Sequence, residues 1–164
     1  MIGRRAFITL LGGAAAWPKE IQEAAAVLRI DTHVLDAGSR REIDAAFATI
    51  ARERLEALVV SNDVVFTTRR MQIALLATRY AVPAIYSVRE YAEAGGLITY
   101  GNNLLDIGRQ VGAYTGRILK GAKPGTLPVI QPTKFELVIN LTAASAIGLN
   151  VPPDLLTLAD EVIE

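Results

Sequence analysis

Polar and aromatic side chains that can hold a small molecule follow two apolar runs of the chain. Asn62 and Asp63 come directly after Ala57–Val60, Tyr86 ends the next apolar run, and Glu90 lies four residues further on. Carboxylates accept hydrogen bonds from ammonium groups, while amides and phenols both donate and accept them. These residue types predict contacts to a small polar solute rather than a centre for making or breaking bonds.

Each candidate also has a purely structural interpretation. Asn62 and Asp63 suit a turn that caps the following helix. Phe66 can stack on an apolar or aromatic ligand or cover the end of a sheet, and Tyr86 can line a cleft or lie half-buried in the core. The carboxylate of Glu90, early in a helix, is favourable with the helix dipole without any ligand. The sequence leaves both interpretations open.

Composition excludes several classes of function. The chain has no cysteine, which rules out disulfides, thiolate chemistry and cysteine-based metal sites. His33 is the only histidine, so a triad or a multi-histidine metal site would depend on this one residue, which we expect on the surface of a strand. The 17 basic and 17 acidic residues balance and aromatic residues make up 6%, which argues against nucleic acid as a partner.

Sequence motifs of common enzymes are missing as well. No strand leads into a Gly-x-Gly-x-x-Gly turn, and neither Gly-x-x-x-x-Gly-Lys-Ser/Thr nor Gly-x-Ser-x-Gly occurs. Arg69 and Arg70 are expected on a solvated helix face. We therefore predict that the chain is not an enzyme and uses neither a cofactor nor a metal ion.

Apolar runs alternate with amphipathic segments in the part of the chain that must position the candidates. Strands are predicted at 30–35, 57–60, 82–86, 97–100 and 135–141. Helices are predicted at 19–28, 67–80, 89–94, 104–120 and 143–147, and one more helix follows the capping box at 39–42. A last helical turn is predicted after 152–153. The 164 residues, 51% of them hydrophobic, suffice for one domain with a core. This order predicts a single α/β lobe, Rossmann-like or flavodoxin-like, with a mainly parallel sheet flanked by helices.

In such a sheet, ligands bind beyond the carboxyl ends of the strands. These ends are predicted at 36–39, 61–66, 86–90 and 100–102. They include all five candidate residues, so we expect the candidates to lie along one edge of the sheet.

The longest predicted helix, 104–120, has two distinct stripes. The apolar stripe consists of Leu104, Ile107, Val111, Thr115 and Ile118, and the adjacent small-residue stripe of Gly108, Gly112 and Gly116. Small residues allow another backbone to approach closely, so this helix is expected to pack against a second body. The segment 121–125, rich in Gly and Pro, ends the helix.

Residues 1–17 have the pattern of an export leader. Arg4-Arg5 precede a short apolar run and then Ala14-Ala15-Ala16, the order found in secretory signals. Adjacent arginines followed by Phe7 are typical of twin-arginine leaders. We expect a leader helix here and a soluble periplasmic product, with cleavage after Ala16 weakly signalled because a helix starts at once. The alternative is a first helix packed on the domain.

Six segments carry a resemblance to a known family. They read GGLITYG at 95–101, GRILKGAKP at 116–124, LPV at 127–129, QPTKFELVINL at 131–141, GLNVPP at 148–153 and ADEVIE at 159–164. With them, the chain resembles the periplasmic ABC transporter substrate-binding proteins, a family that includes tryptophan- and tyrosine-type members. The resemblance covers nearly the whole chain.

The resemblance implies a fold with two Rossmann-like lobes and a ligand cleft between them. Because 164 residues hold only one such lobe, it implies the second lobe over 18–164, with the first lobe deleted. Tyr100, Gly101 and Asn102 then lie where the chain crosses between lobes, which favours a hinge over ligand contact. The helix 104–120 has lost its host and must repack on its own lobe, pair with another copy as a homodimer, or stay exposed.

Three functions follow as hypotheses. The first is a truncated periplasmic solute-binding component of an ABC importer, which works with permease subunits and binds a small solute such as an amino acid at the carboxyl ends of the strands. The second is a remnant or lobe fragment that self-associates without binding solute. The third, an enzyme with a flavodoxin-like core, needs a cofactor loop or paired catalytic groups that the strand ends lack.

Overall fold

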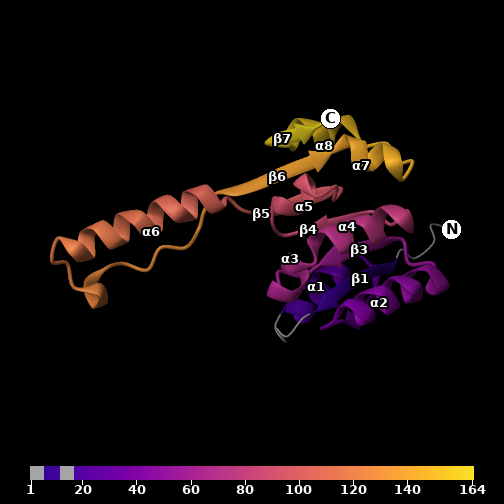
Figure 1. Ribbon diagram of the computed structural model, residues 1–164, viewed down its shortest axis with the longest axis horizontal. Coiled ribbons are helices and arrows are strands. Elements are labelled where there is room, and N and C mark those ends of the chain that lie inside the picture. Colours follow the sequence, from indigo (N-terminus) through magenta and orange to yellow (C-terminus); the bar gives the residue numbers. More distant parts are fainter. Residues whose placement is uncertain (1–5, 12–16) are drawn as a thin grey trace.

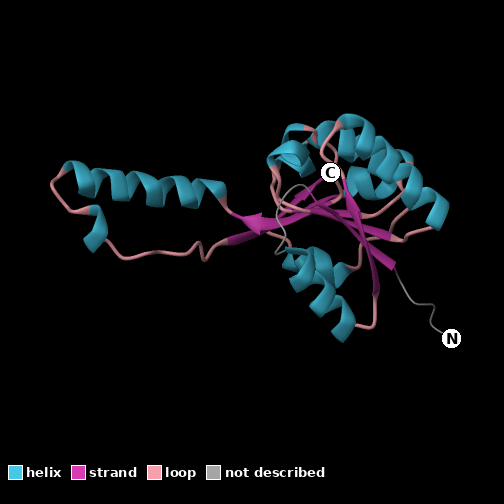
Figure 2. Cartoon of the chain, turned by 90° about the horizontal axis from the view of Figure 1, so that it is seen from below, coloured by secondary structure: helices cyan, strands magenta, loops and turns pink. Residues whose placement is uncertain are grey.

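One sheet organises the described part of the chain, residues 6–11 and 17–164 of a computed structural model (Figures 1 and 2). Its seven strands lie in the order β2 (Asp31–Asp36), β1 (Ala6–Leu11), β3 (Ala57–Val60), β4 (Ala84–Tyr86), β5 (Ile98–Asn102), β6 (Phe135–Asn140) and β7 (Glu161–Ile163). Neighbouring strands run parallel except β5 and β6, which are antiparallel. The predicted α/β lobe with a mainly parallel sheet is confirmed.

Strand β1 departs from the sequence-based expectation. A leader helix is predicted over this run, whereas the structure pairs Ala6–Leu11 with β2 on one side and β3 on the other. Aromatic and β-branched residues such as Phe7 and Ile8 favour strands, and an unbroken apolar run suits a strand that has neighbours on both sides. The helix prediction is therefore corrected. Arg4-Arg5 and Ala14–Ala16 lie outside the described residues, and the export leader stays a prediction.

Helices cover the faces of this sheet (Figure 2). They are α1 (Trp17–Val27), α2 (Arg40–Glu53), α3 (Val64–Thr68), α4 (Arg70–Arg79), α5 (Glu90–Glu93), α7 (Leu141–Ala146) and α8 (Pro153–Leu158). Helix α2 begins as its capping box predicts, because Ser39 Oγ accepts from the Glu42 amide at 3.3 Å. The Glu42 carboxylate reaches one residue further back than the motif requires and accepts from the Gly38 amide at 2.7 Å.

The main hydrophobic core lies between the helices α2 and α4 and the strands β3 and β4. Its largest fully buried side chains include Ile43, Phe47, Ile50, Phe66, Ile73, Tyr86 and Tyr91. In a smaller cluster, Ala143 and Ala144 of α7 pack with Leu97, which precedes β5. The main core includes Val60, Phe66 and Tyr86 and so holds the carboxyl ends of β3 and β4 in fixed positions along the sheet.

A long arm, residues 103–134, projects from the body between β5 and β6 (Figure 1). It contains α6 (Leu104–Leu119), the short 3₁₀ helix η1 (Pro124–Thr126) and an extended return segment. The helix begins where Asn103 Oδ1 accepts from the Asp106 amide at 2.9 Å. The bounds predicted for this helix are thus correct to within one residue.

The arm is held together by contacts between α6 and its own return segment. The Asn103 amide donates to Lys134 O at 3.0 Å, Lys134 Nζ lies 3.1 Å from Asp106 Oδ1, and the Tyr114 hydroxyl donates to Pro128 O. No residue of α6 is buried. Of the three fates predicted for this helix, repacking on its own lobe does not occur.

Candidate functional site

The predicted candidate residues follow three neighbouring strands. Asn62 and Asp63 come after β3, Tyr86 ends β4, and Asn102 ends β5. Because β3, β4 and β5 are adjacent and parallel, these residues share the carboxyl edge of the sheet, where α/β proteins bind ligands.

Asp63 caps a helix at this edge. Its Oδ1 accepts from the Val65 amide at 2.7 Å, and its backbone oxygen accepts from the Thr67 hydroxyl at 2.9 Å. The side chain of Asp63 is half-buried, while Asn62 beside it is exposed. Asp63 therefore caps the helix, as its structural interpretation predicts. Both Asn62 and Asp63 are still accessible to solvent at the carboxyl edge of the sheet.

Phe66 and Tyr86 lie in the core instead of at an open surface. Phe66 is fully buried, and Tyr86, which is 2% exposed, stacks on Tyr91 with ring centroids 4.2 Å apart. Burial raises the pKa of both tyrosines above its ordinary value. Neither Phe66 nor Tyr86 therefore exposes a surface that a ligand could contact. Of the five candidate residues, Asn62, Asp63 and Glu90 remain as candidates for ligand contact.

A pocket of about 300 Å³ opens at the end of β5, next to the start of α5 and the base of the arm. It is lined by Arg89, Glu90, Asn102, Asn103, Leu104, Leu105 and Glu136. Glu90 Oε2 is buried and has no hydrogen-bond partner among the described residues. A carboxylate oxygen without a partner is costly, so this atom is the point in the pocket at which a donor gains most.

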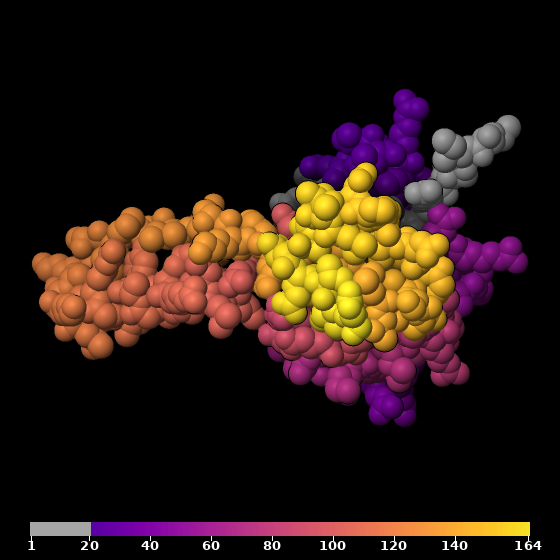
Figure 3. Space-filling view, turned by 90° about the horizontal axis from the view of Figure 1, so that it is seen from above, coloured from indigo at the N-terminus to yellow at the C-terminus, as the bar shows by residue number. Residues whose placement is uncertain are grey.

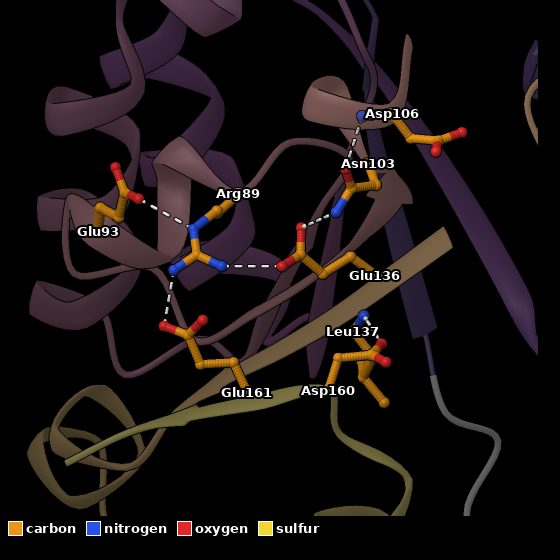
Figure 4. A network of polar contacts seen from close by, with 8 residues as sticks. All are labelled: Arg89, Glu93, Asn103, Asp106, Glu136, Leu137, Asp160 and Glu161. Carbon is orange, nitrogen blue, oxygen red and sulfur yellow. Dashed lines mark hydrogen bonds and ion pairs between the residues drawn. The ribbon is translucent and has the colours of Figure 1, made fainter. Parts of the chain in front are cut away.

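Arg89 ties the pocket to two other elements (Figure 4). Its guanidinium donates to Glu93 at 3.0 Å, to Glu136 at 2.8 Å and to Glu161 at 2.6 Å. The hydrogen bonds that Arg89 donates to the carboxylates of Glu161 and Glu93 raise the pKa of Arg89, and in return Arg89 holds the pKa of the Glu161 carboxyl below its ordinary range. With one cation among several carboxylates, the pocket favours a cationic group over an anion.

Neither Arg89 nor its partners stand out in the sequence as candidate site residues. Glu136 and Glu161 are 47 and 72 residues away from Arg89, so no local spacing connects them. One signal exists: Arg89 stands next to Glu90 at the same strand end.

Tyr100, Gly101 and Asn102 lie where β5 leaves the body for the arm. Tyr100 stacks on Phe135 of β6 with ring centroids 5.6 Å apart. The two strands continue side by side from the body towards the arm (Figure 2). A hinge at these residues remains a prediction.

The Arg89–Glu161 pair predicts an acid-sensitive contribution to stability. A carboxyl whose pKa is lowered on folding stabilises the fold above its unfolded value, about 4.3, and loses this contribution as the pH falls through the folded value. We expect the free energy of unfolding to decrease below about pH 4.3, and to decrease less steeply in Glu161→Gln. Urea unfolding at several pH values measures both slopes. The exposed Glu56→Gln is the control, and equal slopes for wild type and Glu161→Gln would contradict this role.

No helix in the described ranges is long and apolar enough to cross a membrane.

Comparison with known proteins gives a family that matches nearly the whole chain. The model of the family described as ABC transporter substrate binding protein matches residues 16–163. A search of curated proteins gave no match.

Solved structures resemble the chain closely in fold. A conserved domain protein from Vibrio cholerae O1 biovar El Tor superposes with a TM-score of 0.87 at 23% identity, over 96% of this chain and 54% of that one. An ABC domain from Streptococcus pneumoniae in complex with L-Trp gives 0.85 at 22% identity, over 97% of this chain and 56% of that one. The ligand-free, open substrate-binding protein CD0873 from Clostridium difficile superposes with a TM-score of 0.69 at 17% identity, over 97% of this chain and 54% of that one. The chain spans about half the length of these structures.

Proposed function

The chain belongs to the ABC transporter substrate-binding protein family, and we propose that it binds a small solute with an amino group, such as an amino acid, in the pocket at the carboxyl edge. The observation that carries this proposal is the unpartnered Glu90 Oε2 within that pocket. An ammonium group supplies three donors and would satisfy this oxygen. Leu104 and Leu105 form an apolar wall on which an aliphatic or aromatic side chain can pack.

The pocket supports weak binding only. The body and the base of the arm line the pocket. The solved structures that resemble this chain are nearly twice as long, so we infer that a second body supplies the other wall of the pocket in those proteins. An open pocket supplies fewer contacts, while the loss of translational and rotational freedom on binding stays the same. We expect a dissociation constant of about 1 mM or weaker for the isolated chain.

Calorimetric titration with aromatic and branched amino acids tests the proposal. Glu90→Gln removes the charge that an ammonium group would meet and should raise the dissociation constant about tenfold. Glu56→Gln is the matched control, since Glu56 is exposed and precedes β3, at the opposite edge of the sheet. Equal affinity of wild type and Glu90→Gln would contradict the assignment of the site, and sub-micromolar binding would contradict the half-site.

We further propose that the chain acts outside the cytoplasmic membrane with the permease subunits of an ABC importer. Family membership supports this setting, and the basic and apolar residues at the N-terminus agree with export. The second candidate function is a lobe fragment that self-associates through 104–120 without binding solute. The absence of any buried residue in α6 favours it, and a complete lack of solute binding would select it.

A further inference from the structure

The arm presents an apolar helix face that nothing in the described chain covers. One side of α6 faces the return segment, with Ile107 and Tyr114 lining a groove beside Ile130. On the other side, Leu105 is 74% exposed and Leu119 is 82% exposed. These two leucines lie at opposite ends of α6, on the side that also carries Gly108, Gly112 and Gly116, and exposed aliphatic side chains on one helix face indicate an interaction surface. We call this side of α6 the free face.

Glycines on α6 point to a close-packed partner. A Cβ atom added at Gly108, Gly112 or Gly116 would meet no atom within 4 Å, so the chain by itself has no need of glycine there. Each glycine in a helix costs about 1 kcal/mol relative to alanine. Glycine at these positions allows another backbone to approach the helix closely, because no Cβ atom stands in the way.

Charge identifies the surface that suits the arm. The arm, residues 103–134, carries five basic residues and one acidic residue, which gives a net charge of +4. The C-terminal segment, residues 135–164, carries five acidic residues and no basic residue, which gives −5. Residues 1–102 carry 12 basic and 11 acidic residues. The neutral chain is therefore polarised between its arm and its C-terminal segment.

The C-terminal segment also has apolar surface. It spreads over one face of the body near the base of the arm (Figure 3). Leu158 on α8 is 72% exposed, and the carboxylates of Asp154 and Glu164 are exposed. Because the arm leads away from the body (Figure 1), its free face cannot cover this surface in its own chain.

We propose that two copies of this chain form a dimer in which the free face of each arm docks on the C-terminal segment of the other copy. This arrangement brings the basic arm to the exposed carboxylates of Asp154, Asp160 and Glu164, which Arg89 does not neutralise, whereas arm-to-arm pairing would place +4 opposite +4. Charge complementarity of this kind selects partners and registers. The inference does not rest on the proposed solute binding, and Leu105 at the base of α6 belongs to both surfaces.

The arm is long enough for a stable contact. Its helix of 16 residues is about 24 Å long and about 10 Å wide. Two reciprocal arm-to-body contacts bury both surfaces of each footprint, roughly 1,000 Å² in total, which is the lower limit for a biological interface.

Analytical ultracentrifugation of the full chain with charge-reversal variants tests the arrangement. The arm variant combines Arg109→Glu with Lys120→Glu, and the body variant combines Asp154→Lys with Glu164→Lys; all four positions are exposed. Each variant alone should dissociate at least about tenfold more readily than wild type. Their mixture should form a heterodimer, because both contacts are complementary again. Circular dichroism verifies that each variant is folded.

Each outcome decides the proposal. Wild-type dimers of about twice 17.6 kDa that dissociate with added salt, together with rescue in the mixture, support it. A wild-type monomer at micromolar concentration overturns it. An arm variant that dimerises as well as wild type, as arm-to-arm pairing allows, overturns it too, and so does a mixture that stays monomeric.

Discussion

Ile8→Pro is expected to destabilise the chain severely. Ile8 lies in β1 and pairs with His33 of β2 and Leu58 of β3. Proline removes a backbone donor from a strand bonded on both sides and does not fit the interior of a sheet. A loss of about 3 kcal/mol or more is a large share of the stability of a domain, which is about 5–15 kcal/mol. Urea unfolding followed by circular dichroism measures it.

Ile8→Val is the matched control, because it keeps the backbone donor and favours a strand. A chain that begins at Trp17 is the second comparison. It lacks β1, the strand that pairs β2 to the rest of the described sheet, and should lose stability at least as strongly as Ile8→Pro. Cleavage after Ala16 would therefore remove a strand of this sheet, whereas an uncleaved N-terminus keeps it. Unchanged stability of the shortened chain would show that β1 is dispensable.

Gly101→Ala is expected to destabilise the chain by about 3 kcal/mol. A Cβ atom at Gly101 would lie 1.8 Å from the backbone oxygen of Ser87 and 2.8 Å from its carbonyl carbon. A backbone atom cannot turn aside as a side chain can, so β5 must move away from the segment after β4. This movement would also distort the pocket beside Asn102.

Thermal unfolding compares Gly101→Ala with Gly125→Ala. Gly125 lies in η1, where an added Cβ would meet no atom within 4 Å, and its replacement should change the stability by about 0.5 kcal/mol or less. Similar losses in both variants would refute a specific clash at Gly101.

Local patterns in the sequence predict much of the fold. The unbroken apolar run Ala57–Val60 is β3 with the predicted bounds, and the amphipathic repeat behind Ser39 is α2. These elements are predictable because their signals lie within a few residues of each other. The arm helix belongs to the same class, since Asn103 and the glycine-containing end at 121 mark its limits.

Elements that depend on distant contacts escape such reasoning. Strand β7, Glu161–Ile163, has only three residues and exists through its parallel pairing with β6. Strand β1 has the composition of a leader, and only the space between β2 and β3 gives it a place in the sheet.

The same limit applies to the candidate site. Sequence places Glu90 at the carboxyl edge correctly, because a strand precedes it. It does not show that Tyr86 is covered by Tyr91, nor that Arg89 holds Glu161. Those contacts arise from packing between elements that are far apart along the chain.

Chemical-shift mapping by nuclear magnetic resonance tests the central claim most directly. The isotope-labelled chain is titrated with L-tryptophan and L-leucine while backbone amide signals are followed. Binding in the proposed pocket predicts saturable shifts at Glu90, Asn102 and Asn103, and none at Glu56 on the opposite edge. Shifts confined to other surfaces, or no shifts at solute concentrations well above the expected dissociation constant, would contradict the claim that this lobe carries half of a solute-binding site.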